Sequence, residues 1–124
     1  MLFRSRQNDA IECVSIDKNG IQGNGNSFSP SISGDGRFVS FRSSATNLVS
    51  GDTNNVDDIF VYDRLNDSIR RMNVDGRGTQ GDGPCNGTPT ISADGNYMTF
   101  QSEAKNLVPG DTNGVADIFI APSH

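Results

Sequence analysis

The sequence predicts an all-β protein built from short antiparallel strands. Glycine occurs 14 times in 124 residues, and Asp-Gly pairs, which favour tight turns, separate short apolar segments. Those segments are rich in aromatic and β-branched residues, which suit the pleated surface of a strand. No segment keeps an apolar residue every three to four positions over several turns, so helices are not expected.

An internal repeat of about 58 residues accounts for nearly the whole sequence. Residues 30–61 align without gaps onto residues 89–120, and 19 of the 32 positions are identical. The similarity continues on the N-terminal side, where residues 2–16 parallel residues 60–74 at an offset of 58. Such a period is typical of proteins that stack one supersecondary unit several times.

Each unit is expected to form four strands in order along the chain. The first two are joined by a tight turn at Gly34-Asp35-Gly36 or Ala93-Asp94-Gly95. The expected strands are residues 31–33, 37–42, 58–62 and 68–74 in one unit, and residues 90–92, 96–101 and 117–120 in the other, with residues 10–16 as the counterpart of the fourth strand. A repeated four-stranded antiparallel meander of this kind predicts β-propeller blades.

Two long phrases also resemble a known family. The stretches SISGDGRFVSF and TISADGNYMTF are each followed by NLVxGDTNxVxDIF, and together they are similar to bacterial TolB-like propeller repeats. The resemblance covers about residues 10–120. It implies a propeller of about six blades that takes part in protein binding or cell-envelope assembly, often in the periplasm or outside the cell.

The order of the strands indicates two blade-equivalents that are circularly shifted. Residues 2–16 would supply the end of one blade, residues 30–74 a complete blade, and residues 89–120 a blade without its last strand. Two blades cannot close a ring, so we expect residues 10–16 of one subunit to complete the blade at residues 90–120 of the next. Three copies would give six blades, a homotrimeric ring. The alternatives are two or four copies, or a fragment of a longer propeller.

The connections between strands differ in length, and the difference predicts a binding face. In a meander, successive connections alternate between the two ends of the strands. The short turns therefore share one end, and the long connections share the other: residues 17–29, 43–57, 75–88 and 102–116. Long connections commonly carry function, so this end is where we expect a partner protein to bind.

The repeated phrase GDTN, inside two of these connections, allows three interpretations. Asp and Asn cap nearby backbone N–H groups, so the phrase suits a structural turn. It also offers the oxygen ligands that calcium prefers. The candidate ligands are Asp52, Asn54 and Asp58 in one copy and Asp111, Asn113 and Asp117 in the other. Direct contact with a partner is the third interpretation. No other cofactor is expected.

Charge and composition exclude several functional classes. A net charge of −5 argues against nucleic acid as a partner. No stretch approaches the roughly 18 apolar residues of a membrane span, and the first residues do not read as an export signal. Cys13 and Cys85 are too few for a disulfide framework; we expect two unpaired, partly buried thiols, and the alternative is a single bridge between them.

Catalytic motifs are scarce, so the sequence predicts a non-enzymatic scaffold or binding protein. His124 is the only histidine, which argues against a Ser-His-Asp triad. Asp57 corresponds to Ala116 in the second copy, so a repeated carboxylate pair is not expected. The glycine runs at residues 23–25 and 81–83 precede no helix that would orient a phosphate. A carboxylate-based hydrolase or lyase and a carbohydrate-binding propeller are the alternatives.

Overall fold

The computed structural model describes residues 11–49, 57–74, 81–83, 85–108 and 115–123. Within these ranges the chain forms seven strands and no helix. The strands are β1 (Ser27–Ile32), β2 (Phe38–Ser43), β3 (Asp58–Asp63), β4 (Ser68–Arg71), β5 (Cys85–Ile91), β6 (Tyr97–Ser102) and β7 (Asp117–Pro122). The all-β prediction is therefore confirmed. A helix long and apolar enough to cross a membrane is not found in the described part of the chain.

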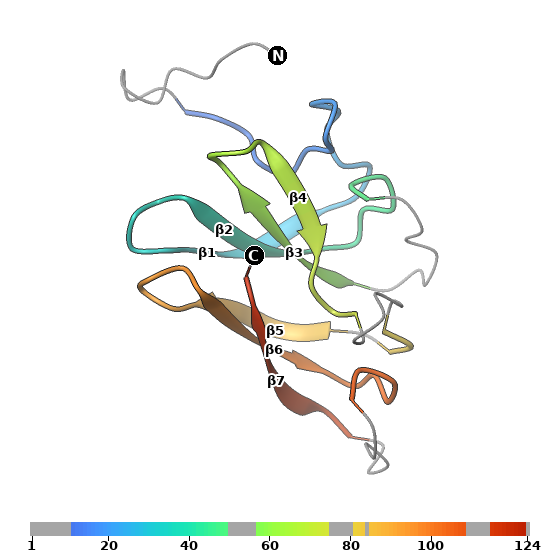
Figure 1. Cartoon of the computed structure of the whole chain (residues 1–124). Coiled ribbons are helices and arrows are strands. Elements are labelled where there is room, and N and C mark those ends of the chain that lie inside the picture. The colour runs from blue at the N-terminus through green and yellow to red at the C-terminus, as the bar shows by residue number, and fades with distance from the viewer. Residues whose placement is uncertain (1–10, 50–56, 75–80, 84, 109–114, 124) are drawn as a thin grey trace.

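The strands form two separate antiparallel sheets that lie face to face (Figure 1). Sheet 1 contains four strands in the order β1-β2-β3-β4, and sheet 2 contains three in the order β5-β6-β7. Each strand pairs with its neighbours in the chain, so both sheets are meanders. Tight turns join β1 to β2 and β5 to β6, where Gly36 and Gly95 both have a φ of 76°.

The expected and observed strand bounds differ mainly in the first and fourth strands. β1 and β5 begin earlier than expected, because each continues through a bulge. In β1 the irregularity falls between Phe28 and Ser31, where Ser29 has a positive φ of 59°. A non-glycine residue in this region is uncommon, so the local pattern gave no sign of it.

The fourth strand was expected to extend to residue 74, and this was wrong, because β4 ends at Arg71. Past that point the backbone N–H of Met72 still donates to the carbonyl of Ile59, over 2.7 Å. The next partner of β3 is a side chain: the N–H of Ile59 donates to Oδ1 of Asn73. The Asn73 side chain thus replaces the next backbone hydrogen bond between β3 and β4, and the strand ends there.

The main core lies between the two sheets. The inner face of sheet 1, meaning the face that contacts sheet 2, carries the buried side chains of Phe38, Ile59 and Val61. On the inner face of sheet 2, Met98 and Phe100 pack into the same cluster. Apolar burial of this kind is the main force that holds two sheets together.

A second apolar cluster covers the outer face of sheet 1. Phe41 and Phe60 stack there at a centroid distance of 5.7 Å, and Tyr62 lies beside them. Val14 and Ile16, from the segment that precedes β1, pack onto this cluster. Figure 1 shows this blue segment on the side of sheet 1 that faces away from sheet 2. Within the described part of the chain, residues 11–15 belong to no strand.

The outer face of sheet 2 is apolar and exposed. Tyr97, Ile118 and Ile120 share this face by their pairing register, and their side chains are 53%, 73% and 70% exposed. Large apolar side chains gathered on one face of a sheet mark an interaction surface more often than a solvent surface.

Candidate functional site

The end of the sheets opposite the tight turns is built from paired connections. In sheet 1, the segment before β1 is tied to the segment after β2 through Asn24. Its backbone N–H donates to Oδ1 of Asn47, and its own Oδ1 accepts from the N–H of Thr46, each over 2.8 Å. The Asn47 amide donates onward to the carbonyl of Gln22. These described portions of the long connections therefore lie together, as the meander geometry predicts.

Sheet 2 carries the same arrangement with different side chains. The N–H of Asp82 donates to Oδ1 of Asn106 over 2.9 Å, and Oδ1 of Asp82 accepts from the N–H of Lys105 over 2.7 Å. Asp82 therefore does in sheet 2 what Asn24 does in sheet 1. The connections at this end are held by reciprocal side-chain hydrogen bonds, so their surface is supported from within.

The Gly-x-Gly runs belong to this bracing. A Cβ on Gly25 would lie 2.9 Å from the backbone nitrogen of Ala45, and a Cβ on Gly83 would lie 2.9 Å from that of Ala104. No other residue type allows the two segments to come this close without a shift. As a sequence pattern, these runs suggest only a nucleotide loop, which no following helix supports. Their recurrence 58 residues apart, each ahead of an Ala-x-Asn-Leu phrase, was the available signal.

An open depression of about 500 Å³ lies beside this end of sheet 1. Asp17, Lys18 and Asn19 line it with polar atoms, and Leu48 and Ile69 give it apolar surface. We call it the Lys18 depression. Its mixture of one cation, polar groups and apolar surface suits contact with a peptide side chain better than bond cleavage, which needs an activated nucleophile or a paired acid and base.

The predicted calcium ligands fall only partly within the described residues. Asp52, Asn54, Asp111 and Asn113 lie outside them, whereas Asp58 and Asp117 begin β3 and β7. Among the described residues, no three His, Cys, Asp or Glu side chains group as metal ligands would. Asp58 is buried, and its Oδ1 accepts from the Asn73 amide over 2.6 Å. This carboxylate therefore has a structural bond that ligand spacing alone does not reveal.

The cation interpretation remains a prediction with a direct test. If the two GDTN phrases bind calcium in the folded state, calcium at 100 times its dissociation constant stabilises the fold by about 2.7 kcal/mol per site. The melting temperature should then rise as calcium is added and return when a chelator is added. An unchanged melting temperature in calcium and in chelator would leave the turn and the partner contact as the remaining interpretations.

The bond between Asn73 and Asp58 is expected to matter for stability. Replacing Asn73 with alanine removes one hydrogen-bond donor to a buried carboxylate and the acceptor of the Ile59 N–H, so the free energy of unfolding should fall by about 1–3 kcal/mol. Urea unfolding followed by circular dichroism measures the change. Asn19→Ala, at an exposed position, is the matched control and should alter stability by less than about 0.5 kcal/mol. Equal effects of the two variants would contradict the role given to Asn73.

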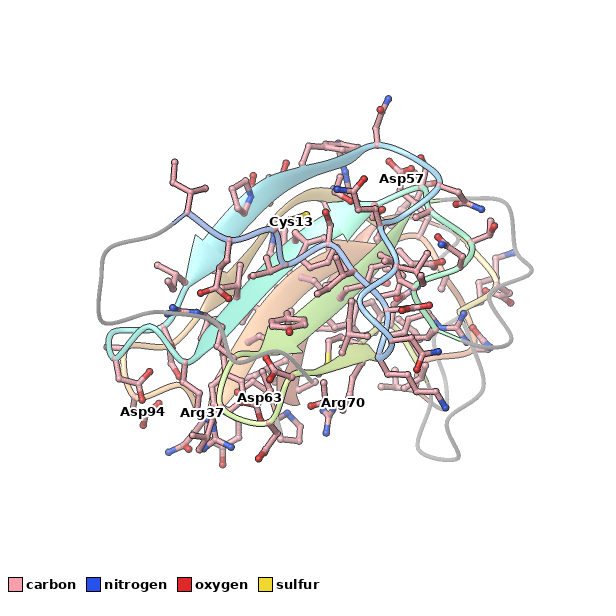
Figure 2. All side chains as sticks on the ribbon, turned by 90° about the horizontal axis from the view of Figure 1, so that it is seen from above. Cys13, Arg37, Asp57, Asp63, Arg70 and Asp94 are labelled. Carbon is pink, nitrogen blue, oxygen red and sulfur yellow. The ribbon has the colours of Figure 1, made fainter. Side chains whose placement is uncertain are left out.

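The turn end of sheet 1 is held by an ion pair instead. Arg37 donates from Nε and Nη2 to the two carboxylate oxygens of Asp63, each over 3.0 Å. Figure 2 places both residues at the end of the strands that lies away from Asp57. Burial alone would raise the pKa of Asp63, but the Arg37 bonds and the N–H donors of Leu65 and Asn66 outweigh it and lower that pKa.

This lowered pKa of Asp63 predicts how stability depends on pH. A carboxyl group with a lower pKa in the folded state stabilises the fold above its unfolded pKa, roughly pH 4, and loses this effect as pH falls through the folded pKa. Asp63→Asn should therefore melt below the wild type at pH 7, and the difference should shrink as pH falls below the unfolded pKa and through the lower folded pKa. Melting curves across this pH range measure it; a constant difference would contradict the assignment.

The two cysteines are both free, as expected. Cys13 is exposed, and Figure 2 shows it on the segment that crosses sheet 1. Cys85 is buried at the start of β5, and burial raises the pKa of its thiol to about 12. A thiol that stays protonated is a poor nucleophile, so Cys85 is a packing residue.

No family model, curated protein or solved structure matches this chain. The similarity of its phrases to TolB-like repeats stays a prediction.

Proposed function

We propose that this protein is a non-enzymatic β-propeller scaffold of TolB-like type that assembles with copies of itself and binds another protein. In this proposal each sheet is a blade, and the copies close into a ring, most simply a trimer with six blades. The end that carries the long connections is the face that binds the partner protein.

The observation that carries the proposal is the direction in which the sheets stack. The inner face of sheet 1 presents Phe38, Ile59 and Val61 to sheet 2. The residues 59 positions later, Tyr97, Ile118 and Ile120, occupy the outer face of sheet 2. The face of sheet 2 that is exposed to solvent is therefore the equivalent of the face of sheet 1 that is buried against sheet 2. The contact is head-to-tail, so a further sheet can be added in the same way.

Closure of the stack into a ring follows from the cost of leaving its ends open. An open stack would keep one apolar face and one strand edge exposed at its ends, whereas a ring leaves neither. Two sheets per chain and the six blades implied by the TolB-like resemblance give three copies.

The hydrogen bonds and ion pairs of the described carboxylates favour a scaffold function rather than a carboxylate-based hydrolase. Asp63 pairs with Arg37, and Asp58 bonds to Asn73. Asp35 and Asp94 each accept from a serine hydroxyl and from a backbone N–H in the tight turns, which lowers their pKa values. Groups bound in this way hold turns and strand ends, and a lowered pKa is opposite to what a general acid needs.

Arrays of peptides and of glycans test the binding role. We expect the labelled wild-type protein to bind peptides. Lys18→Glu, which reverses the charge in the Lys18 depression, should weaken that binding and keep the subunit number of the wild type, measured by light scattering. Leu65→Ser, at an exposed position in the turn between β3 and β4, is the control and should bind as the wild type does. Binding to glycans alone, cleavage of the arrayed ligand, or equal loss in both variants would contradict the proposal.

A further inference from the structure

Sheet 2 has an open edge at β7. β7 pairs with β6 through six residue pairs, whereas its counterpart β3 pairs on one side with β2 and on the other with β4. Among the described strands, none lies beside the second edge of β7. Unpaired backbone donors and acceptors on such an edge favour the addition of another strand.

The segment before β1 is the sequence equivalent of the strand that sheet 2 lacks. The last residues of this segment also lie where the last residues of such a strand would lie. Just past the end of β4, the carbonyl of Asn73 accepts from the N–H of Gly81 over 2.8 Å. At the equivalent positions 58 residues earlier, the carbonyl of Ser15 accepts from the N–H of Gly23 over 3.0 Å. Both segments thus turn into the following connection through the same backbone contact.

The packing of the two segments corresponds as well. Met72, just after β4, is buried in the core between the sheets, against the inner face of sheet 2. Val14, its equivalent, packs against the outer face of sheet 1, in the cluster of Phe41 and Phe60. Residues 14–16 therefore sit on sheet 1 as residues 72–74 sit on sheet 2. Residues 14–16 thus lie where a fourth strand of a neighbouring sheet would end, although the chain places no sheet on that side of sheet 1.

The strand cannot be supplied to β7 by its own chain in this arrangement. Val14 and Ile16, at the end of this segment, pack against the outer face of sheet 1. Sheet 2 lies against the inner face, so sheet 1 separates the segment from sheet 2 (Figure 1). A second copy, placed head-to-tail, meets both needs. Its β7 would lie next to this segment, and the exposed outer face of its sheet 2, with Ile118 and Ile120, would be covered.

We propose that residues 11–13 of one copy pair with β7 of a second copy in a fixed antiparallel register: Ile11 with Ala121, Glu12 with Ile120, and Cys13 with Phe119. This inference rests on the proposed self-assembly and deepens it by naming the contact. The register follows from sheet 1, where β3 and β4 pair Tyr62 with Ile69, Val61 with Arg70, and Phe60 with Arg71. It would also bring the fully exposed side chain of Ile11 onto the inner face of the partner's sheet 2.

The contact between copies differs from the contact within the chain at two points. Arg42 and Asp57, which form an ion pair beside the in-chain contact, correspond to Gln101 and Ala116. A Cβ on Gly34 would lie 2.7 Å from the carbonyl oxygen of Ala93, and position 93 itself carries a Cβ. The contact between copies therefore depends more on apolar burial, and its turn corners must lie further apart than those within one chain.

Engineered disulfides test the register. The variant carries Ile11→Cys and Ala121→Cys, with Cys13→Ser to remove the exposed native thiol. Oxidised glutathione then accepts the two thiol hydrogens and their electrons as each disulfide forms. We expect covalent products up to three subunits on a non-reducing gel, which collapse to one band on reduction. Cys85 should stay out of exchange, because it is buried and its thiol pKa is raised to about 12.

The matched control shifts the register by one residue. Ile11→Cys with Ile120→Cys, again with Cys13→Ser, places the two thiols on opposite faces of the strand pair, so covalent oligomers should be few. A second test uses the native Cys13 with Phe119→Cys, which should give the same products as the first variant. It keeps the proposal open to refutation if the first variant does not fold.

The outcomes separate this inference from the proposed assembly. A wild-type mass of three copies, with no disulfide in either in-register variant, would refute the strand exchange and leave the ring. Monomers in both measurements would refute the assembly itself. A disulfide within one chain, or stronger products in the shifted control, would also overturn the register.

Discussion

Changing Ile118 and Ile120 together to aspartate is expected to turn the proposed ring into folded monomers. Both side chains are more than two-thirds exposed in the single chain, so the charges cost the monomer little. In the ring each would be buried against a neighbouring sheet, where an isoleucine contributes about 1.5–3 kcal/mol and an unpaired charge is strongly unfavourable. Light scattering should show the fall in mass, and circular dichroism should show unchanged β-structure.

Leu65→Asp is the matched control for this prediction. Leu65 is 68% exposed, like the two isoleucines, but lies in the turn between β3 and β4 and not on the outer face of sheet 2. Its variant should keep the mass of the wild type. An assembled Ile118→Asp, Ile120→Asp protein would show that copies meet elsewhere, and a loss of mass in the Leu65 variant would show that the effect is not local.

Replacing Phe60 with alanine is expected to cause the largest loss of stability, about 3–5 kcal/mol. The Phe60 side chain is fully buried in the middle of sheet 1, and its ring stacks on Phe41. Alanine would leave a cavity between Phe41, Tyr62 and Leu48, and the backbone of a central strand allows little collapse into it. Guanidinium unfolding measures the change.

Phe28→Ala provides the comparison for Phe60. Phe28 is half-buried in β1, and the guanidinium of Arg42 lies 4.2 Å from its ring centroid. Losing this contact should cost about 1 kcal/mol. Equal costs for the two phenylalanines would mean that the cluster on the outer face of sheet 1 is not the packed core described above.

Much of the fold follows from local sequence. β2, β3 and β6 combine aromatic and β-branched residues within six positions, which is a strong strand signal. The Ser-x-Asp-Gly turns are predictable too, because the Asp side chain forms hydrogen bonds within two residues of itself. Asp35 accepts from the N–H of Arg37 and from the Ser33 hydroxyl. In these cases the partners lie within a few residues of each other.

Other features depend on partners far apart in the chain, and local patterns do not contain them. The end of β4 depends on Asn73 meeting Asp58, 15 residues earlier. The bracing of the long connections depends on Asn24 meeting Thr46 and Asn47. The calcium prediction shows the same limit, because the spacing of oxygen atoms does not reveal that Asp58 is buried and bonded to an amide.

The subunit number in solution tests the central claim most directly. Native mass spectrometry of the wild-type chain, whose mass is 13.3 kDa, should give a single species of three subunits, about 40 kDa. This species should persist on dilution, because a closed ring has no free end from which copies leave. A stable 13.3 kDa monomer at every concentration, with Ile118 and Ile120 still exposed to solvent, would contradict the account.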